Sequence, residues 1–213
     1  PDLIEPEQLD PSVNLTPRLK ERGGRVRTLR WTGWEPSTKE DRVLWDEDPE
    51  TVFLGDGSWT TSGIGVRNKS LIFDFGGNFT IERIRFFPRN TVQDAPQYPF
   101  QTDFIRQFEL LVHDGQDLVL DGTGRLVPQL DDFEVLERTT NNEDAVVEVK
   151  LDPAQTARFV RLKSTSSFPY EIDEFEVFGQ GFISSSRYIS HVYDLGSPAT
   201  WGNLSWMEQT VDL

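Results

Sequence analysis

Polar and apolar residues alternate most clearly between Ser70 and Phe87. In the first half, one face of the expected strand carries Leu71, Phe73 and Phe75, and the other carries Ile72 and Asp74. Gly76 and Gly77 interrupt the alternation, which Ile84 and Phe86 then resume. A period of two places successive side chains on opposite faces of a strand. The pattern therefore predicts two strands joined by a short connection at the glycine pair.

Similar alternation marks the rest of the central region. The segments that show it are Phe104 to Asp114, Leu118 to Leu120, Ala145 to Leu151, Arg158 to Lys163 and Phe175 to Val177. No stretch of about ten residues or more has a helical period, and Gly, Pro and Asp punctuate the chain. Short strands separated by turn residues are typical of antiparallel sandwiches. We expect an all-β fold in which these strands form a sandwich.

Two segments of the central region lack a strand pattern and are predicted to be long loops. They are residues 88–103 and residues 121–143, the second interrupted only by an apolar patch at Phe133, Val135 and Leu136. Long loops inside a compact domain are usually functional or mobile.

The two ends of the chain differ from the centre. Residues 1–24 are rich in proline and charge and are predicted to be an extended arm, so that the sandwich occupies residues 25–180. In residues 181–213 part of the central pattern recurs: Asp74-Phe-Gly with Thr80, Ile84 and Phe86 matches Asp194-Leu-Gly with Thr200, Leu204 and Trp206. This end is expected to be a strand-rich extension, or the start of a truncated second unit, packing on the sandwich or on another protein; a coincidental match remains an alternative.

Arginines are concentrated at the start of the central region. Arg25, Arg27 and Arg30 alternate with Val26 and Leu29, and Trp31 and Trp34 follow. One interpretation is a first strand with solvated arginines on one face. The other is a patch that docks on an acidic partner.

Charge restricts the partners. With 36 acidic against 21 basic residues, the formal net charge is -15. Phosphate binding requires a basic face, so nucleic acid is an unfavourable partner, and an anionic membrane surface is disfavoured for the same reason. An acidic surplus is compatible with divalent cations, although it also simply confers solubility. No apolar run approaches the roughly 18 residues of a membrane span. The chain contains no cysteine, which excludes disulfides and thiolate sites.

Three motifs together resemble a known family. The pattern at 70–87, the segment ARFVRLKS at 157–164 and the segment EIDEFEVFG at 171–179 are similar to the discoidin family, the coagulation factor 5/8 type C domains, and to the related family 32 carbohydrate-binding modules. The resemblance covers roughly residues 14–180 and, because cysteine is absent, is stronger to the bacterial members. It implies a jelly-roll sandwich that binds rather than catalyses, in an extracytoplasmic protein: periplasmic, cell-surface or secreted.

The resemblance also implies a structural Ca²⁺ site. A family loop that precedes the central strands matches residues 45–53, with Glu47 at the usual glycine and Phe53 at the usual tryptophan. The implied ligands are Asp46, Asp48, Thr51 and Glu174. Hard cations take six to eight oxygens, which carboxylates, a hydroxyl and loop carbonyls supply. Glu47 counts against the calcium site, because the loop needs a positive φ at this position, which glycine adopts more readily than other residues. Acidic loops without a bound metal are also common.

Ligands of such modules contact loop aromatics and polar side chains, because a sugar presents an apolar face and hydroxyl groups. The expected ligand-binding residues are Trp31, Trp34, Arg89, Asn90, Tyr98, Phe100, Phe168 and Tyr170, with Gln97 and Asp103 as further polar candidates. The loops at 88–103 and 164–170 are expected to form the sides of the site. Tyr98 and Phe100 are the rings most expected to be exposed, while Trp59 most resembles a core residue.

Catalytic chemistry finds little support. The two histidines, His113 and His191, are far apart, and no nucleophile elbow, zinc-protease motif or phosphate-cradling loop occurs. With 36 carboxylates, a glycosidase pair cannot be argued from sequence. The chain is therefore expected not to be an enzyme. We predict a glycan-binding module of an exported protein. The alternative is a structural subunit of a cell-envelope or extracellular complex, whose arm and tail dock on neighbouring protein subunits.

Overall fold

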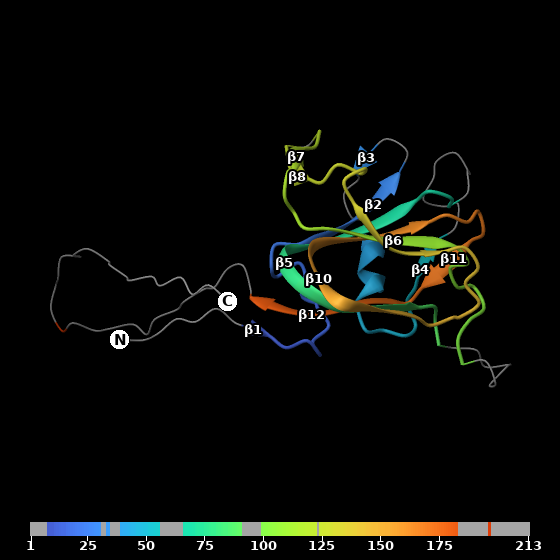
Figure 1. Cartoon of the computed structure of the whole chain (residues 1–213). Helices are drawn as coiled ribbons and strands as arrows, with labels where there is room; N and C mark the ends of the chain where they lie inside the picture. The colour runs from blue at the N-terminus through green and yellow to red at the C-terminus, as the bar shows by residue number, and fades with distance from the viewer. Residues whose placement is uncertain are drawn as a thin grey trace.

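The computed structural model describes residues 8–30, 33–34, 39–55, 66–90, 99–122, 124–182 and 196 (Figure 1). Within them the chain is all-β apart from one 3-10 helix, η1, at Lys39–Leu44. The strands are β1 (Gln8–Leu9), β2 (Arg25–Arg30), β3 (Gly33–Trp34), β4 (Phe53–Gly55), β5 (Ser70–Phe87), β6 (Phe108–His113), β7 (Val119–Leu120), β8 (Leu126–Val127), β9 (Glu134–Thr139), β10 (Val147–Ser164), β11 (Tyr170–Ile172) and β12 (Glu174–Phe182). No helix in these ranges is long and apolar enough to cross a membrane.

The main sheet follows the order β1-β12-β5-β10-β6-β9, and its strand pairs are antiparallel. β2 joins this sheet through the first half of β5, and β3 pairs with β2. Two further pairs, β11 with β4 and β7 with β8, are separate two-stranded sheets. The predicted all-β antiparallel architecture is confirmed.

The predicted strand pair at 70–87 is wrong in one respect: β5 is a single strand of 18 residues. Its first half pairs with β2 and its second half with β12, while β10 accompanies both. The glycines mark the point where the partner changes, not a turn. Gly76 has φ +79°, and a Cβ there would lie 2.2 Å from the carbonyl oxygen of Arg22. A glycine is therefore required by both the backbone conformation and the close approach.

The core lies between β5 and the elements that cross it. Phe73 stacks on Phe175 with ring centroids 4.3 Å apart, and Phe86 stacks on Phe175 at 5.6 Å. From the other side η1, β4 and β11 contribute Leu44, Phe53 and Ile172 to the same cluster. Burial of these large side chains is the main favourable term for such a sandwich.

The opposite face of the sheet is also covered, which the sequence did not reveal. Ile72 and Phe159 project from this face and pack with Leu111 and Phe133 in a second cluster. The chain between β6 and β9 covers this face of the sheet, with Phe133 in the second cluster. The segment 121–143, predicted to be a loop, contains two strands, β8 and β9. Because β5 and β10 carry apolar residues on both faces, both faces must be removed from water.

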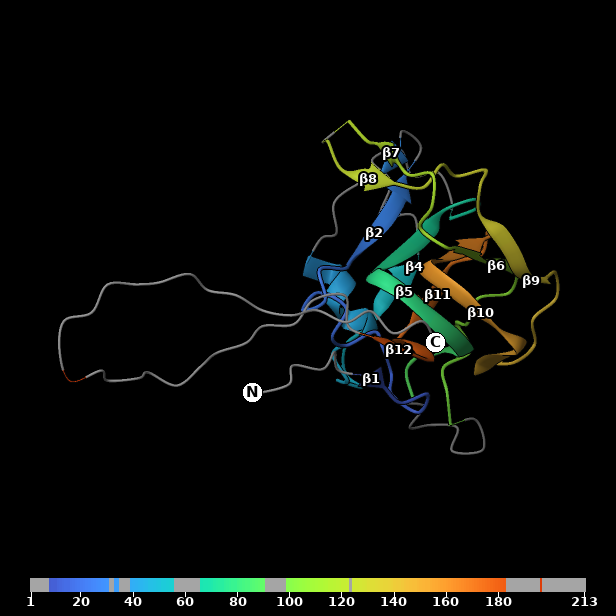
Figure 2. The same cartoon turned by 60° about the vertical axis from the view of Figure 1, so that its left-hand side comes forward.

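The described part of the predicted N-terminal arm is not free. β1 pairs with the end of β12, and the backbone of Leu15 donates to Val177 at 2.7 Å. Leu15 and Leu19 are fully buried in the core. Residues 8–24 therefore belong to the folded domain, as Figure 2 shows for β1 beside β12. Residues 1–7 and, apart from the end of β12 and Gly196, the predicted C-terminal extension at 181–213 lie outside the described residues.

Candidate functional site

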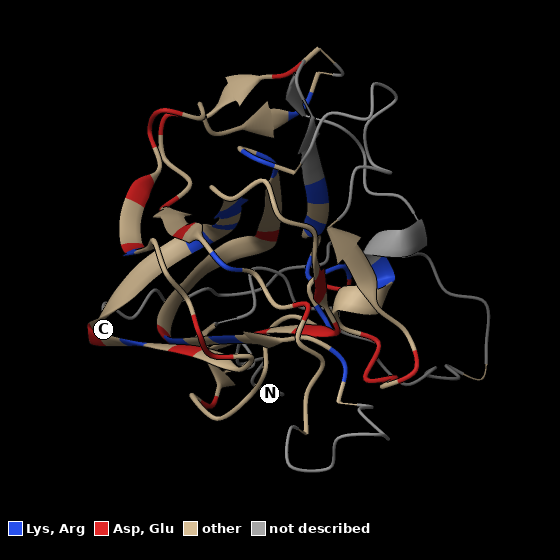
Figure 3. Cartoon of the chain, turned by 90° about the vertical axis from the view of Figure 1, so that its right-hand side faces the viewer, with Lys and Arg blue, Asp and Glu red and all other residues tan. Residues whose placement is uncertain are grey.

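A shallow cleft of about 630 Å³ lies at the end of the sandwich that carries β4 and β11. Four segments that are distant in sequence form it: β4, the chain that leads into β6, the bend after β9, and the chain that leads into and includes the start of β11. The lining residues are Leu54, Thr102, Asp103, Phe104, Arg106, Gln107, Asn141, Phe168, Pro169, Tyr170 and Glu171. Figure 3 faces this end and shows acidic segments around it. A shallow recess with mixed apolar and polar walls suits a ligand that presents both kinds of surface.

Phe168 presents the cleft with an exposed aromatic ring. Its side chain is 70% exposed, although it precedes a buried strand. The loop before it is fixed from within, since the backbone of Phe168 donates to the Ser166 hydroxyl at 3.0 Å and the Ser164 hydroxyl donates to the Ser166 carbonyl at 3.2 Å. The ring is thus held out by a constrained loop, which lowers the entropy lost on stacking against a ligand.

Arg89 and Glu171 form the ion pair beneath the cleft. The Arg89 guanidinium donates to Glu171 Oε2 from Nη2 at 3.0 Å and from Nε at 3.3 Å, and its backbone N–H donates to Oε1 at 3.2 Å. The Glu171 side chain is only 2% exposed, whereas that of Arg89 is 35% exposed. The hydrogen bonds to Glu171 raise the pKa of Arg89. The pair ties the end of β5 to β11 and compensates the buried carboxylate.

Polar groups on the rim are held by short-range contacts. The backbone N–H of Glu171 donates to the Asp103 carbonyl at 2.7 Å. Arg106 donates to the Thr102 carbonyl at 2.9 Å, and its guanidinium lies 3.8 Å from the ring centroid of Phe104. Asn141 donates to Glu143 at 2.9 Å. These contacts orient donors and acceptors around the Phe168 ring.

The structure brings some predicted ligand-binding residues together. Phe168 and Asp103 line the cleft, and Arg89 is connected to it through its ion pair with the lining residue Glu171. Tyr170 also lines the cleft, but its side chain is only 3% exposed, and burial raises the pKa of its phenol. Phe100 is half-buried with its ring edge-on to Phe87 at 5.8 Å, and Asn90 is exposed.

Other predicted residues cannot be placed. Trp31, Trp59, Gln97 and Tyr98 lie outside the described residues, and Trp34 lies in β3 with a side chain that is not described.

Several cleft residues have no counterpart in the prediction: Leu54, Thr102, Arg106, Gln107 and Asn141. Leu54 enters the site because β4 pairs with β11 in the register that sets it opposite Glu171. No local pattern in the sequence gives that pairing. The polar run at Asn141 and Asn142 was a possible signal, because such residues at a loop bend often hold turns near binding surfaces.

The acidic loop is stabilised by its own hydrogen bonds. The Thr51 hydroxyl donates to both carboxylate oxygens of Asp46 at 3.0 Å, and the Asp48 backbone donates to Asp46 Oδ1 at 3.1 Å. The Glu47 backbone donates to Glu174 Oε1 at 2.7 Å, which joins the loop to β12. Glu47 has φ 59°, so the position that usually carries glycine keeps its left-handed conformation with a longer side chain.

Negative charge accumulates where this loop meets β12. Burial raises the pKa of Glu174 to about 8, and the charges of Asp173 and Asp46 act in the same direction. Burial also raises the pKa of Asp173 to about 6, with further contributions from Asp46 and Glu171. Asp173 Oδ1 is buried and makes no hydrogen bond. Ionised carboxylates are destabilised here, since water is excluded and neighbouring charges have the same sign.

The donors fit a hard cation in their chemistry, because they are carboxylate and hydroxyl oxygens at the junction of the loop and β12. They do not form a complete ligand set as they lie. Among the described residues, no group of three or more His, Cys, Asp or Glu side chains is arranged to hold a metal ion.

Comparison with solved structures places the fold. The module CpGH89CBM32-5 from Clostridium perfringens, solved in complex with GalNAc-β-1,3-galactose, matches with a TM-score of 0.51 and 14% identity over 78% of this chain and 100% of the module. A second module, CpGH89CBM32-6 from the same organism, matches with a TM-score of 0.51 and 18% identity over 78% of this chain and 99% of that module. No protein-family model and no curated protein matches the sequence.

The chain therefore has the discoidin-like β-sandwich fold of family 32 carbohydrate-binding modules. The resemblance drawn from the sequence motifs is confirmed at the level of the fold.

Proposed function

We propose that this chain is a non-catalytic module that binds glycans in the cleft at the β4–β11 end. The observation that carries the proposal is the Phe168 ring, 70% exposed and facing a cleft lined by amide, carboxylate and guanidinium groups. An aromatic face stacks on the C–H face of a pyranose, and the polar rim provides hydrogen bonds to its hydroxyls. A module of the same fold, solved with GalNAc-β-1,3-galactose, is consistent with this ligand class.

Binding of this kind requires no rearrangement of the ion pair beneath the cleft. Glu171 is committed to Arg89, so the pair acts as a support that fixes β11 and the loop before it. The ligand then contacts Phe168 and the rim groups of Asp103, Gln107 and Asn141. Since the cleft is open and shallow, we expect weak affinity at a single site and stronger retention on polymeric glycans through multivalency. Such a module belongs in an exported, extracytoplasmic protein.

A panel of immobilised glycans tests the proposal. We expect the wild-type protein to be retained by one or more neutral glycans and the Phe168→Ala variant to lose about tenfold or more in affinity, as for a central aromatic anchor. Leu120→Ala is the matched control, since Leu120 is also exposed, at 69%, but lies on β7, away from the cleft. Equal retention of Phe168→Ala and wild type would exclude the cleft as the binding site.

We further propose that the acidic loop binds Ca²⁺ through Asp46, Asp48, Thr51 and Glu174. The support is the concentration of oxygen donors at this junction, where burial and neighbouring carboxylates raise the pKa values of Glu174 and Asp173 and the buried Asp173 Oδ1 makes no hydrogen bond. When bound, the cation supplies positive charge that offsets the repulsion between the carboxylates. The loop residues themselves keep the loop joined to β12 through the Glu47 to Glu174 hydrogen bond.

A further inference from the structure

The β7–β8 hairpin exposes apolar side chains at the end of the molecule that also carries β2 and β3 (Figures 1 and 2). Leu120 and Leu126 are direct cross-strand partners and are 69% and 51% exposed. In the other pair, Val127 is only 3% exposed, whereas Val119 is 40% exposed. The hairpin is thus anchored through Val127, while its other face presents two leucines to solvent. Paired exposed leucines are an unfavourable arrangement for a surface that stays uncovered.

The hairpin also has unpaired strand edges. β7 and β8 pair only with each other among the strands that the structure describes. A two-stranded sheet is marginally stable alone, and an unpaired edge offers backbone donors and acceptors to an added strand. This geometry favours an extended segment as the group that covers the leucines.

Arginines surround the base of the hairpin. Arg27 donates to the Asp121 carboxylate at 3.0 Å, and the backbone of Arg125 donates to the same carboxylate at 2.9 Å. On β10, Arg158 donates to Asp74 of β5 at 2.8 Å from Nε and at 3.2 Å from Nη2. Arg25 lies farther from that carboxylate, with Nε 3.8 Å from Asp74 Oδ2, and its side chain is 27% exposed. Arg125 is exposed beside Leu126.

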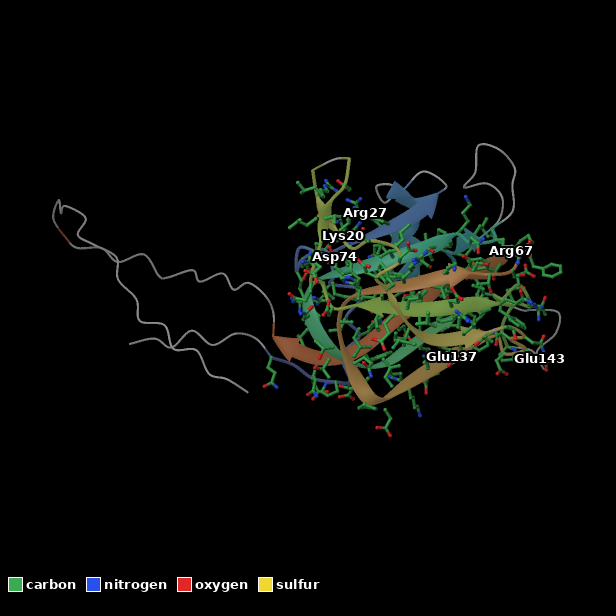
Figure 4. All side chains as sticks on the ribbon, turned by 45° about the horizontal axis from the view of Figure 1, so that its top comes forward. Lys20, Arg27, Arg67, Asp74, Glu137 and Glu143 are labelled. Atoms are coloured by element: carbon green, nitrogen blue, oxygen red, sulfur yellow. The ribbon has the colours of Figure 1, made fainter. Side chains whose placement is uncertain are left out.

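The local charge is opposite in sign to that of the whole chain. Three guanidinium groups, from Arg25, Arg27 and Arg158, lie around two carboxylates, Asp74 and Asp121, and the exposed Arg125 donates to Asp121 only from its backbone, whereas the chain carries a formal charge of -15. Figure 4 shows Arg27 and Asp74 at one end of the sandwich and Glu137 and Glu143 toward the other. Burial lowers the pKa of Arg25, and the charges of Arg27 and Arg125 act in the same direction. The cluster is therefore complementary to a negatively charged partner.

We propose that the β7–β8 hairpin and the exposed Arg25 and Arg125 form a docking surface for an extended protein segment in which acidic and apolar residues alternate. Its backbone would pair with a free edge of the hairpin, its apolar side chains would cover Leu120 and Leu126, and its carboxylates would contact the two guanidinium groups. Alternation in a strand places the apolar and acidic side chains on opposite faces, which matches the separation of leucines and arginines. A glycan fits this surface less well, since Phe168, at the other end, is the exposed aromatic ring among the described residues.

The test measures binding of short fluorescent peptides to the full chain by anisotropy. The probes are a peptide that alternates Glu and Leu, a second that alternates Lys and Leu, and a third that alternates Glu and Ser. We expect the Glu–Leu peptide to bind and both others to bind at least about tenfold more weakly. The double variants Arg25→Gln/Arg125→Gln and Leu120→Ser/Leu126→Ser should each weaken the Glu–Leu complex by about tenfold. Arg138→Gln and Val135→Ser, at exposed residues of β9, are the matched controls and should leave it unchanged.

Amide chemical shifts report whether the peptide adds as a strand. The largest changes should fall on Val119, Leu120, Leu126 and Val127. The proposal is overturned if the Glu–Leu peptide fails to bind, if the Lys–Leu peptide binds equally, or if the controls weaken binding as much as the double variants. It is also overturned if an oligouronate displaces the peptide and binds more tightly, since that result assigns the surface to an acidic glycan. Glycan binding at the cleft is measured separately and does not depend on any of these results.

Discussion

The ring of Tyr170 lies directly over Gly55. A Cβ built on Gly55 would be 2.5 Å from Tyr170 Cζ and 2.6 Å from Cε1, and the two residues are direct partners in the β4–β11 pair. Tyr170 is buried and follows the loop that presents Phe168. Because Gly55 has no side chain, β11 can approach β4 closely. This approach in turn fixes the position of Phe168, the exposed ring that precedes β11, at the cleft.

Gly55→Ala should destabilise the protein by roughly 1–3 kcal/mol, because the methyl group displaces a buried ring. It should also weaken glycan binding, since β11 carries one wall of the cleft. Chemical denaturation and glycan retention measure the two effects. Gly122→Ala is the control, because nothing lies within 4 Å of a Cβ at that position. Equal stability of the two variants would show that the close approach has no energetic consequence.

Arg89→Met should cost about 2 kcal/mol of folding free energy, since it leaves the Glu171 carboxylate buried without its counter-ion. This free-energy cost is smaller than that of breaking a fully buried ion pair, because the Arg89 side chain is 35% exposed. Glu171→Gln keeps the shape of the side chain and removes its charge, so it should cost less. Arg83→Met breaks a more exposed pair with Glu148 and should change little. A large loss in Arg83→Met with none in Arg89→Met would contradict this ranking.

Added Ca²⁺ should raise the melting temperature, and chelator should reverse the rise. A ligand present at a hundred times its dissociation constant stabilises the folded state by roughly 2.7 kcal/mol. Asp46→Asn and Glu174→Gln should abolish most of the shift, whereas the exposed Glu134→Gln, on β9, should retain it. A melting temperature that is the same with calcium and with chelator would exclude the site.

Glu109 should make stability depend on pH in the acidic range. Lys163 donates to its carboxylate at 2.8 Å and holds the pKa of Glu109 below its ordinary value, and Arg138 acts in the same direction. The stabilisation is present above the unfolded-state pKa and is lost as the pH falls through the lower pKa of the folded state. Glu109→Gln should thus cost about 1 kcal/mol at neutral pH and progressively less below about pH 4.5. Urea denaturation across this range, with Glu134→Gln as the reference, measures the difference; a constant cost at all pH values would contradict the assignment.

Most strands of the main sheet could be predicted because their residues alternate with a period of two, but β1 and β9 lie in segments that were predicted to be an arm and a loop. The prediction failed where long-range pairing decides the structure. No local pattern distinguishes the two strands expected at 70–87 from the continuous β5, since the partner changes from β2 to β12 across Gly76, where the close approach of Arg22 requires a glycine. Likewise Leu15 and Leu19 sit in a segment rich in proline and charge, yet each fills a place in the core.

The cleft was only partly predictable for the same reason. Phe168 was one of several candidate rings, while Tyr98 and Phe100 were the rings most expected to be exposed, and Glu47 has the positive φ expected at its position. Leu54 and Asn141 reach the cleft through the β4–β11 register and through the bend after β9, which depend on tertiary contacts. Tyr170 could not be told from Phe168 by sequence, although one is buried and the other exposed.

Chemical-shift mapping with a glycan tests the central claim most directly. The isotopically labelled full chain is titrated with the glycan that the panel selects, or with GalNAc-β-1,3-galactose, and the amide shifts are followed. The account predicts saturable changes at Phe168, Asp103, Gln107 and Asn141, with none at Leu120 on the hairpin, and their loss in Phe168→Ala. Saturable changes confined to another surface, or no change with any neutral glycan, would contradict the assignment of a glycan-binding cleft at the β4–β11 end.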